Sequence, residues 1–549
     1  MMRFPSRRLP SRGRLALLTS LAAFALLGTA VPAVAAASQS ATPQQPTGPA
    51  CSVTYLQSQL HLANVTVDSA SLNTTGTFTA PPQPPITGLP AFCDVSLTQT
   101  DSAGNPIHIE VWLPSDWNGR FQGVGGAVFE CGPMFGETAA AIEAGYSSAT
   151  TDCGVNPADL LFGNWALNPD GTANTALIDD FSYQGIHDMS VAGEAVSRAY
   201  YTAPLKYSYF NGCSTGGREG LMEAQMFPAD YNGIVSGSPA INWTKFIPSE
   251  LWPELVMLQS NDFLPSCKEQ AFTNAVIAAC ADGSGVIENP AACNFNPLKL
   301  VGVVTPCGTI TKLDADVMEK IWQGPVVQGQ HLWYGLEPGA NTLGLAGTTT
   351  SSTGTTGPAA FPIPVGWLQY WLIQNPSFNW QTLSYEQFVQ DFNLSVSKVP
   401  EIATDNPNLS AFARDGGKIL IWHGLADQLI FPQGTIQYYQ RVQDTLGAAN
   451  TETFARLFVA PGAAHCSPGA GPAPANPLQD VVNWVENGQA PSTILATGGT
   501  GPAGQATQRQ LCNYPYLSEY VSGDPASLTS YSCKLLTPGQ QQQLTALYP

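Results

Sequence analysis

The chain has 549 residues, more than one hydrophobic core usually serves, so we expect two domains or one domain with a large insertion. Its formal net charge of −19 would become −24 on removal of an N-terminal leader with five arginines and no acidic residues, and such a surface disfavours nucleic acid and anionic membranes as partners. The twelve cysteines predict six disulfides in an exported protein, because no Cys-x2-Cys pair or Cys/His cluster supports a zinc site.

Residues 1–35 have the features of an export signal. Five arginines precede an apolar run from Leu15 to Ala30, and Ala33-Val34-Ala35 matches a small-residue cleavage site. Arg7-Arg8 is compatible with twin-arginine export, although the surrounding residues match that motif poorly. The run is too short and too broken by glycine for a membrane anchor, so we predict a secreted protein. The composition of residues 36–50 predicts a disordered lead.

Strands and helices alternate in the first half of the mature chain, which is typical of a mainly parallel α/β sheet. The Thr- and Pro-rich segment between Cys51 and Cys93 is expected on the outside, held by a disulfide between them. A Cys131–Cys153 disulfide would tie a strand end to the loop before it. We expect strands at 107–114, 120–127, 144–153 and 207–211, a helix at 181–201, and a strand with its terminal loop at 231–240.

A match to Gly-x-Ser-x-Gly, residues 212–216, follows the strand that begins at Tyr207 and precedes a predicted helix at 218–227. This strand–turn–helix context predicts a nucleophile elbow with Ser214 at its tip. The glycines fit because a Cβ at either flank of the strained turn would crowd the helix or the neighbouring strand. A plain strand-to-helix turn is the alternative.

The alternation stops near residue 241. Residues 241–414 hold most of the twelve tryptophans, four cysteines and Gly/Thr-rich tracts, and they predict a lid inserted between two parts of a catalytic domain, 51–240 and 415–549. Within the lid, residues 348–357 indicate a linker-like tract. The alternation returns with a strand at 418–422, a helix at 435–446, a last clear strand at 454–459 and a terminal helix at 478–485. A Cys512–Cys533 disulfide would close a tail loop.

A serine nucleophile needs a base, usually histidine, and the base needs an orienting acid. Asp427 and His465 each follow the end of a different predicted strand, and the order Ser214, Asp427, His465 is that of hydrolases with this architecture. His423 is the rival base, although its position favours packing or a supporting hydrogen bond. Asp415 is the rival acid, but it precedes its strand and so lies at the wrong edge of the sheet.

Cys213 immediately precedes Ser214, and Cys466 immediately follows His465. A disulfide holds two Cα atoms about 5.5 Å apart, so a Cys213–Cys466 bond would hold the serine and the histidine side by side. The alternative is that both cysteines are buried or paired elsewhere. The glycine loop after the strand at 120–127 lies where hydrolases supply a backbone N–H to the oxyanion, although an ordinary turn is equally compatible.

The Cys-Ser … Asp … His-Cys arrangement resembles the tannase and feruloyl esterase family. The resemblance covers nearly the whole mature chain, through Trp117-Asn118-Gly119-Arg120-Phe121, the Gly-Cys-Ser-Thr-Gly-Gly-Arg elbow, His423-Gly-x-x-Asp427 and His465-Cys466. It implies an α/β-hydrolase fold with a large lid and cleavage of esters of aromatic acids such as ferulate and gallate. It also implies Ser214, Asp427 and His465 as the triad, with the N–H groups of Thr215 and Gly126 as oxyanion donors.

The lid of this family usually carries an aspartate-rich calcium loop between paired cysteines. Here the corresponding stretch, 280–288, is short, and Asp282 is its only clear acidic ligand, whereas calcium takes six to eight oxygens. We therefore expect no required cofactor and at most a weak calcium site at Asp282. The resemblance also implies the lid disulfides Cys280–Cys293 and Cys267–Cys307.

The predicted reaction is acyl transfer to water, with a small aromatic ester, plant polyphenol or cell-wall ester as substrate and a monomer as the working form. Four lid aromatics are expected to stack on the acyl group, although each is equally compatible with the lid core: Trp333, Trp367, Trp371 and Phe378. Feruloyl esters are the preferred prediction, with tannin and terephthalate monoesters as alternatives. No arginine lies between Arg218 and Arg414, which argues against a clamp for a free carboxylate. A non-catalytic binding protein on a hydrolase scaffold and a peptidase of the same fold are the other classes considered.

Overall fold

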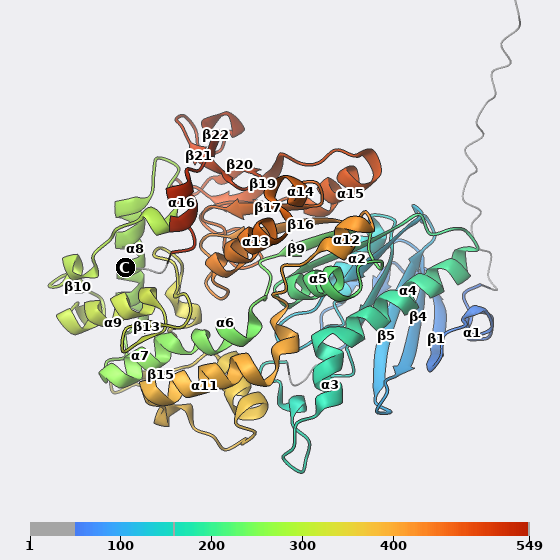
Figure 1. Ribbon diagram of the computed structural model, residues 1–549, viewed down its shortest axis with the longest axis horizontal. Coiled ribbons are helices and arrows are strands. Elements are labelled where there is room, and N and C mark those ends of the chain that lie inside the picture. Colours follow the sequence, from blue (N-terminus) through green and yellow to red (C-terminus); the bar gives the residue numbers. More distant parts are fainter. Residues whose placement is uncertain (1–49, 157–159, 547–549) are drawn as a thin grey trace, which may run out of the picture. The chain divides into compact units, whose positions relative to one another are not determined.

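The computed structural model describes residues 50–156 and 160–546, so the predicted export signal and nearly all of the predicted disordered lead lie outside the described residues. Within these residues the largest sheet has nine strands in the order β1-β4-β5-β7-β6-β8-β9-β16-β17 (Figure 1). The six strands from β7 to β17 in this order are parallel, and β1, β4 and β5 form an antiparallel extension. Their bounds are Val65–Asn73 (β1), Phe92–Thr100 (β4), Pro106–Pro114 (β5), Ser147–Thr151 (β7), Arg120–Val124 (β6), Tyr207–Cys213 (β8), Gly233–Gly237 (β9), Lys418–Gly424 (β16) and Ala455–Ala460 (β17).

Helices cover both faces of this sheet, because neighbouring strand residues point to opposite faces. In β8, Phe210 packs in the cluster that contains residues of α4, α5 and α13, whereas Tyr209 packs in the cluster that contains residues of α2 and α15. The bounds of these helices are Gly185–Tyr201 (α4), Thr215–Met226 (α5), Pro432–Leu446 (α13), Phe135–Glu143 (α2) and Pro477–Asn487 (α15).

The segment between Cys51 and Cys93 lies on the outside, as expected, and it also forms the edge of the fold. It contributes β1, which pairs with β4 at the edge of the central sheet, and a short helix, α1 (Val53–Gln59). In β1 only Val65 and Val67 are buried, so the alternation of apolar residues that normally marks a strand is weak there.

The inserted segment is mainly helical. Its helices, green to orange in Figure 1, gather on one side of the sheet: Trp243–Glu250 (α6), Trp252–Ser260 (α7), Ser266–Cys280 (α8), Lys312–Gln323 (α9), Pro362–Gly366 (α10) and Tyr385–Lys398 (α11). Their apolar cluster also contains Phe129, Trp165 and Phe181 from the first half of the chain, so the lid and the sheet domain share a core. The tract expected to be linker-like forms a small hairpin of β14 (Thr348–Thr350) and β15 (Thr356–Pro358).

The C-terminal part contains more structure than the tail loop that the sequence predicts. Residues Thr493–Thr500 (β19) and Ala506–Cys512 (β20) pair with Ala473–Pro474 (β18), and Tyr516–Tyr520 (β21) pairs with Tyr531–Leu535 (β22). The last helix, α16 (Pro538–Gln543), lies next to the lid, where Tyr334 donates a hydrogen bond to the carbonyl of Thr545 at 3.2 Å (Figure 1). The segment that follows α16 therefore contacts the lid.

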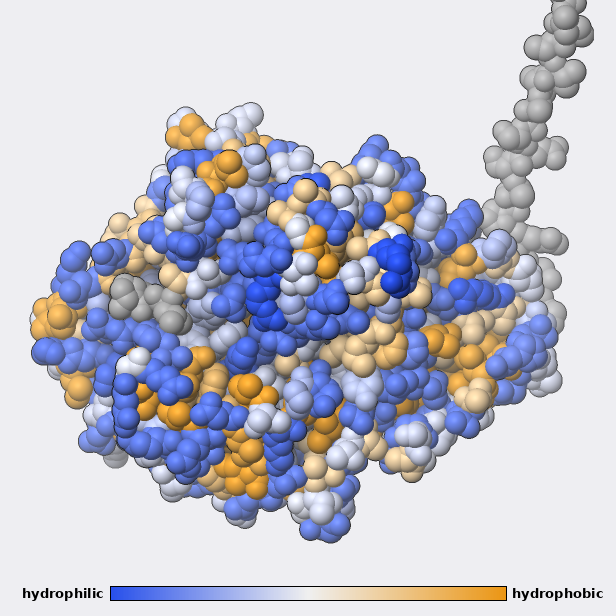
Figure 2. Space-filling view, in the orientation of Figure 1, coloured by the Kyte–Doolittle hydropathy of each residue, from blue (hydrophilic) through white to orange (hydrophobic). Residues whose placement is uncertain are grey.

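On the face shown in Figure 2, hydrophilic residues predominate and apolar residues form scattered patches. None of the helices formed by the described residues has both the length and the apolar character needed to cross a bilayer.

Candidate active site

Ser214 stands between the end of β8 and the start of α5 in a strained conformation, with φ 63° and ψ −123°. The flanking glycines permit this turn, because a Cβ on Gly212 would lie 2.4 Å from the carbonyl oxygen of Gly216. This is the steric crowding that the sequence predicts for a nucleophile elbow. The amide of Thr215 is the first of α5 and makes no hydrogen bond with any described residue, so it is free to serve a ligand.

Two buried side chains of α5, Arg218 and Glu219, hold two segments beside the elbow in place. Arg218 donates to the carbonyls of Ser182 and Phe181 at 2.7 and 2.9 Å. Glu219 accepts a hydrogen bond from the amide of Gly126 at 2.8 Å. Burial raises the pKa of Glu219 to about 8, although the charge of Arg218 opposes this.

The contact with Glu219 contradicts one predicted role. Gly126 was expected to donate its N–H to the oxyanion, but that N–H is already used within the protein. Val128, two residues later, lines the pocket at Ser214, and its amide makes no hydrogen bond in the described part of the chain. The hydroxyl of Thr215 donates to the carbonyl of Val128 at 2.8 Å, which fixes this loop against the elbow.

Asp427 and His465 follow the ends of the adjacent parallel strands β16 and β17. His465 Nδ1 lies 2.8 Å from Asp427 Oδ2, and the other carboxylate oxygen accepts from the amides of Leu429 and Ile430, both at 2.9 Å. Burial would raise the pKa of Asp427, but the neighbouring histidines, His465 foremost, outweigh it and hold that pKa well below its usual value.

His423, the rival base, is fully buried and supports the acid. Its Nε2 lies 3.1 Å from both Asp427 Oδ2 and the carbonyl of Ile430, two acceptors, so this nitrogen carries the proton. Nδ1 then accepts from the hydroxyl of Thr435 at 2.9 Å. Asp415, the rival acid, lies before β16 and pairs with Arg414 at the surface.

The disulfide Cys213–Cys466 joins the two loops, with 5.9 Å between its Cα atoms across 253 residues of sequence. The other five pairs are also those expected: Cys51–Cys93, Cys131–Cys153, Cys267–Cys307, Cys280–Cys293 and Cys512–Cys533. The last pair links β20 to β22 rather than closing a loop.

Ser214 and His465 line one pocket. No hydrogen bond joins Ser214 Oγ to His465 or to any other described residue, and hydrogen bonds of this kind often tighten only when substrate binds. The rest of the lining is mostly apolar: Val128, Thr215, Ala240, Trp243, Phe246, Ile247, Glu250, Phe361, Ile363, Leu429 and Ile430.

The four lid aromatics predicted to bind substrate do not line this pocket. Trp333, Trp367 and Trp371 are buried in the core of the lid, and Phe378 packs against the same cluster. The aromatic side chains at the serine are Trp243, Phe246 and Phe361 instead. Sequence reasoning also missed Glu250, whose signal was present: it shares with Trp243, Phe246 and Ile247 the i, i+3, i+4, i+7 spacing of one helix face.

Asp282 does not have the surroundings of a calcium ligand. Its Oδ1 accepts from the amide and hydroxyl of Ser284, at 2.7 and 2.5 Å. Nearby, Glu288 accepts from the buried guanidinium of Arg509 at 3.0 Å and from the amide of Tyr520 at 2.8 Å. One oxygen of Asp282 and one of Glu288 are thus used within the protein, which argues against a tight calcium site, and the weak site expected at Asp282 stays a prediction.

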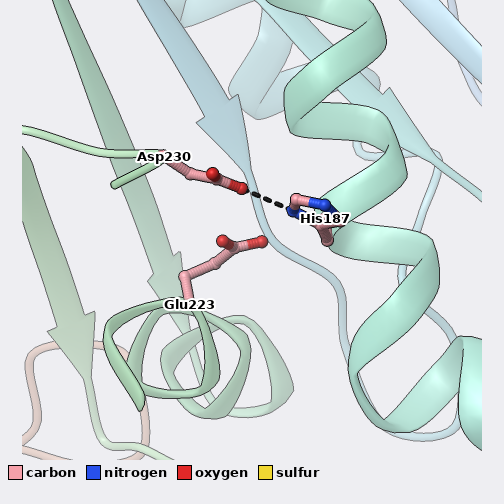
Figure 3. Close-up of side chains that lie close together, drawn as sticks. All are labelled: His187, Glu223 and Asp230. Carbon is pink, nitrogen blue, oxygen red and sulfur yellow. Dashed lines mark hydrogen bonds and ion pairs between the residues drawn. The ribbon is translucent and has the colours of Figure 1, made fainter. Parts of the chain in front are cut away.

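Among the described residues, one group has the side-chain types and the spacing that a metal ion requires. It consists of His187, Glu223 and Asp230, whose ligand atoms lie within 4.8 Å of one another (Figure 3). His187 Nδ1 lies 2.6 Å from Asp230 Oδ2, a direct hydrogen bond, whereas neighbouring ligands of one ion lie roughly 3 Å apart. Burial and the charge of Asp230 raise the pKa of Glu223 well above its usual value. We interpret the group as a hydrogen-bonded histidine–aspartate pair beside a buried glutamate, about 12 Å along α5 from the elbow.

Comparisons with known proteins agree on one family. A family model described as tannase and feruloyl esterase matches residues 93–534. A probable feruloyl esterase of Arthroderma benhamiae is 41% identical over 460 residues, 80% of this chain and 85% of that protein. Feruloyl esterase B of Aspergillus niger is 28% identical over 478 residues, 80% of this chain and 86% of that protein.

Solved structures show the same fold. Tannin acyl hydrolase from Aspergillus niger superposes with a TM-score of 0.80 at 22% identity, covering 91% of this chain and 97% of that one. Feruloyl esterase B from Aspergillus oryzae superposes with a TM-score of 0.75 at 26% identity, covering 88% and 99%. The predicted α/β-hydrolase fold is confirmed.

Proposed function

The chain belongs to the tannase and feruloyl esterase family, and we propose that it is secreted and cleaves esters of aromatic acids through a Ser-His-Asp triad. Family membership makes it a carboxylic ester hydrolase of the feruloyl esterase type.

In the proposed reaction Ser214 Oγ attacks the ester carbonyl while His465 Nε2 takes its proton, and a tetrahedral intermediate forms. Asp427 holds His465 Nδ1–H at 2.8 Å and stabilises the imidazolium. The free amides of Thr215 and Val128 are the candidate donors to the oxyanion. Collapse releases the alcohol with the proton from His465, and water then hydrolyses the acyl-enzyme by the same steps in reverse.

The pocket favours an uncharged aromatic acyl group. Trp243, Phe246 and Phe361 offer flat apolar surface. No lysine or arginine is among the described residues that line it, so a free carboxylate would lose its hydration without gaining a partner. This supports hydroxycinnamic or gallic esters over a terephthalate monoester.

Export is supported by the six disulfides, which persist in oxidising compartments. The observation that carries the catalytic proposal is the disulfide that brings the strained serine into one pocket with a histidine that is hydrogen bonded to Asp427.

The test is hydrolysis of methyl ferulate, methyl gallate and a terephthalate monoester by the purified mature protein and by its Ser214→Ala variant. We expect activity on the first two, little on the third, and a loss of at least about 10³-fold in the variant. Equal rates in the variant would contradict the assignment of Ser214, and faster turnover of the terephthalate monoester than of methyl ferulate would contradict the proposed selectivity.

A further inference from the structure

Glu250 is the acidic side chain in the wall of the pocket that holds Ser214 and His465. It is the last residue of α6, and the apolar residues on the same helix face, Trp243, Phe246 and Ile247, line the pocket with it. A hydrogen bond from the hydroxyl of Ser395 to the carbonyl of Thr244, at 2.6 Å, holds α6 in place. The carboxyl group therefore has a set position in an otherwise apolar wall.

Glu250 Oε2 is buried without a hydrogen-bond partner among the described residues. The residue is 3% exposed, and it makes neither a hydrogen bond nor an ion pair with any of the described residues. Buried polar groups are nearly always hydrogen bonded, so an unpaired one facing a ligand pocket calls for a partner from outside the protein.

The chemistry of that partner follows from the protonation state of the acid. Burial, with the negative charge of Asp427, raises the pKa of Glu250 well above its usual value, which favours the neutral form of the group. A neutral carboxyl group has one donor and acceptor capacity. A hydroxyl group complements both, whereas a carboxylate offers only acceptors and brings a charge into an apolar wall.

Resting on the proposed esterase function, we propose that Glu250 is a subsite for a ring hydroxyl of the aromatic acyl group and selects phenolic acyl esters over their unsubstituted counterparts. The apolar residues around it pack against the ring, and Glu250 exchanges hydrogen bonds with the hydroxyl that the ring carries into the pocket. Selection of this kind is strong, because an analogue without the hydroxyl leaves a buried polar group unpaired.

The test compares two esters that differ by one hydroxyl, methyl p-coumarate and methyl cinnamate, and its readout is the ratio of their kcat/KM values. We expect a ratio of about 10 or more for the wild type. Glu250→Leu, of similar volume, should bring the ratio close to one, and Glu250→Gln, which still donates and accepts, should keep most of it. Glu254→Leu is the matched control, because Glu254 is a buried glutamate outside the pocket, and it should keep the wild-type ratio.

A wild-type ratio near one with measurable turnover would overturn the subsite and leave the esterase proposal standing, as would an unchanged ratio in Glu250→Leu. Failure to hydrolyse both of these esters, together with methyl ferulate and methyl gallate, would overturn the esterase proposal. In that case calorimetric binding of both esters to Ser214→Ala decides the subsite. Tighter binding of methyl p-coumarate that Glu250→Leu abolishes supports it, and equal binding overturns it.

Discussion

The carboxylate of Asp427 is held from four directions, by two imidazoles and two backbone amides. Such a group has little freedom to turn away from His465, so the tautomer and orientation of the base are set before substrate arrives. His423 contributes to this hold without facing the pocket, which makes it a positioning residue.

Replacing His423 by phenylalanine should lower kcat about 10- to 100-fold. The loss of one donor also raises the pKa of Asp427, because fewer interactions then oppose the effect of burial. Asp427 is protonated at a higher pH as a result, so the acidic limb of the pH–rate profile moves upward. His108→Phe, at an exposed position on β5, serves as the control. An unmoved acidic limb would show that His423 does not act through the acid.

Active-site residues that lie within a recognisable sequence motif could be predicted from the sequence, whereas those outside any motif could not. Ser214, Asp427 and His465 each follow a strand end, and the structure brings the three loops together as that spacing predicts. Gly126 was assigned wrongly because its competing partner, Glu219, lies 93 residues away. Glu250 was missed because an acid within an apolar helix face acquires meaning only when the pocket beside it is known.

Among the loops, the disulfides Cys213–Cys466 and Cys51–Cys93 differ in what they hold in place. It joins the β8 and β17 loops at the site, whereas Cys51–Cys93 joins the N-terminal helix region to the edge of the sheet. Both cross-links restrict the unfolded chain, but only the first constrains the distance between serine and histidine.

The double variant Cys213→Ala/Cys466→Ala should therefore lose about 10²-fold in kcat, since small displacements of reacting groups are costly. Cys51→Ala/Cys93→Ala should lower Tm while kcat of the folded enzyme stays unchanged. Steady-state kinetics and thermal melts of both variants, side by side, measure this. Equal effects on kcat would mean that the first disulfide contributes stability alone.

Between the lid and the C-terminal strands, a buried guanidinium links the loop that contains Glu288 to β20. Arg509 on β20 is fully buried, donates to Glu288 at 3.0 Å, and stacks over Tyr531 with 4.2 Å to the ring centroid. It thereby ties the loop after α8 to the C-terminal hairpin. Because this link is made of side chains, removing divalent ions should leave it intact.

We expect EDTA to leave Tm unchanged, and Arg509→Met to lower the free energy of unfolding by about 1–3 kcal/mol, because the half-buried carboxyl group of Glu288 would lose its hydrogen bond from the guanidinium. Thermal and denaturant unfolding with and without EDTA measure both effects. Arg414→Met, at an exposed ion pair, is the control and should cost at most about 1 kcal/mol. A large drop in Tm with EDTA would show that an ion binds after all.

Among the elements, the parallel strands could be predicted because each is a short apolar run with a helix or a glycine loop after it. The edges of the fold could not. Strand β1 buries only Val65 and Val67, and β22 has no buried residue, so neither shows clear alternation. Such strands are defined by the partner with which they pair, and that information lies far away in the sequence.

Considered as a whole, the molecule buries many carboxyl groups, and most of them have no cation beside them; Glu219, next to Arg218, is an exception. Burial raises the pKa to about 8 for Glu219, Glu254, Glu269 and Glu337. Each holds a proton when folded that the unfolded chain releases above about pH 4.5. Folding therefore takes up protons between about pH 4.5 and 8.

The sign of the pH dependence follows. In this window the unfolded state binds fewer protons, so the free energy of unfolding falls as pH rises, by up to about 1.4 kcal/mol per pH unit for each such group. We expect stability to be greatest near pH 5 and several kcal/mol lower at pH 8. Urea unfolding without reductant, at steps between these values, measures the slope.

Glu337→Gln isolates one contribution, because Glu337 is buried and burial is the cause of its shift. The amide keeps the hydrogen bond from Gln433 but cannot ionise. The variant should match the wild type near pH 5, exceed its stability at pH 8, and show a shallower slope between them. Glu386→Gln, at an exposed position, should leave the slope unchanged. If stability instead rose with pH, the buried acids would have to be ionised and paired in the folded protein, and the neutral state assigned to Glu250 in the pocket would lose its basis too.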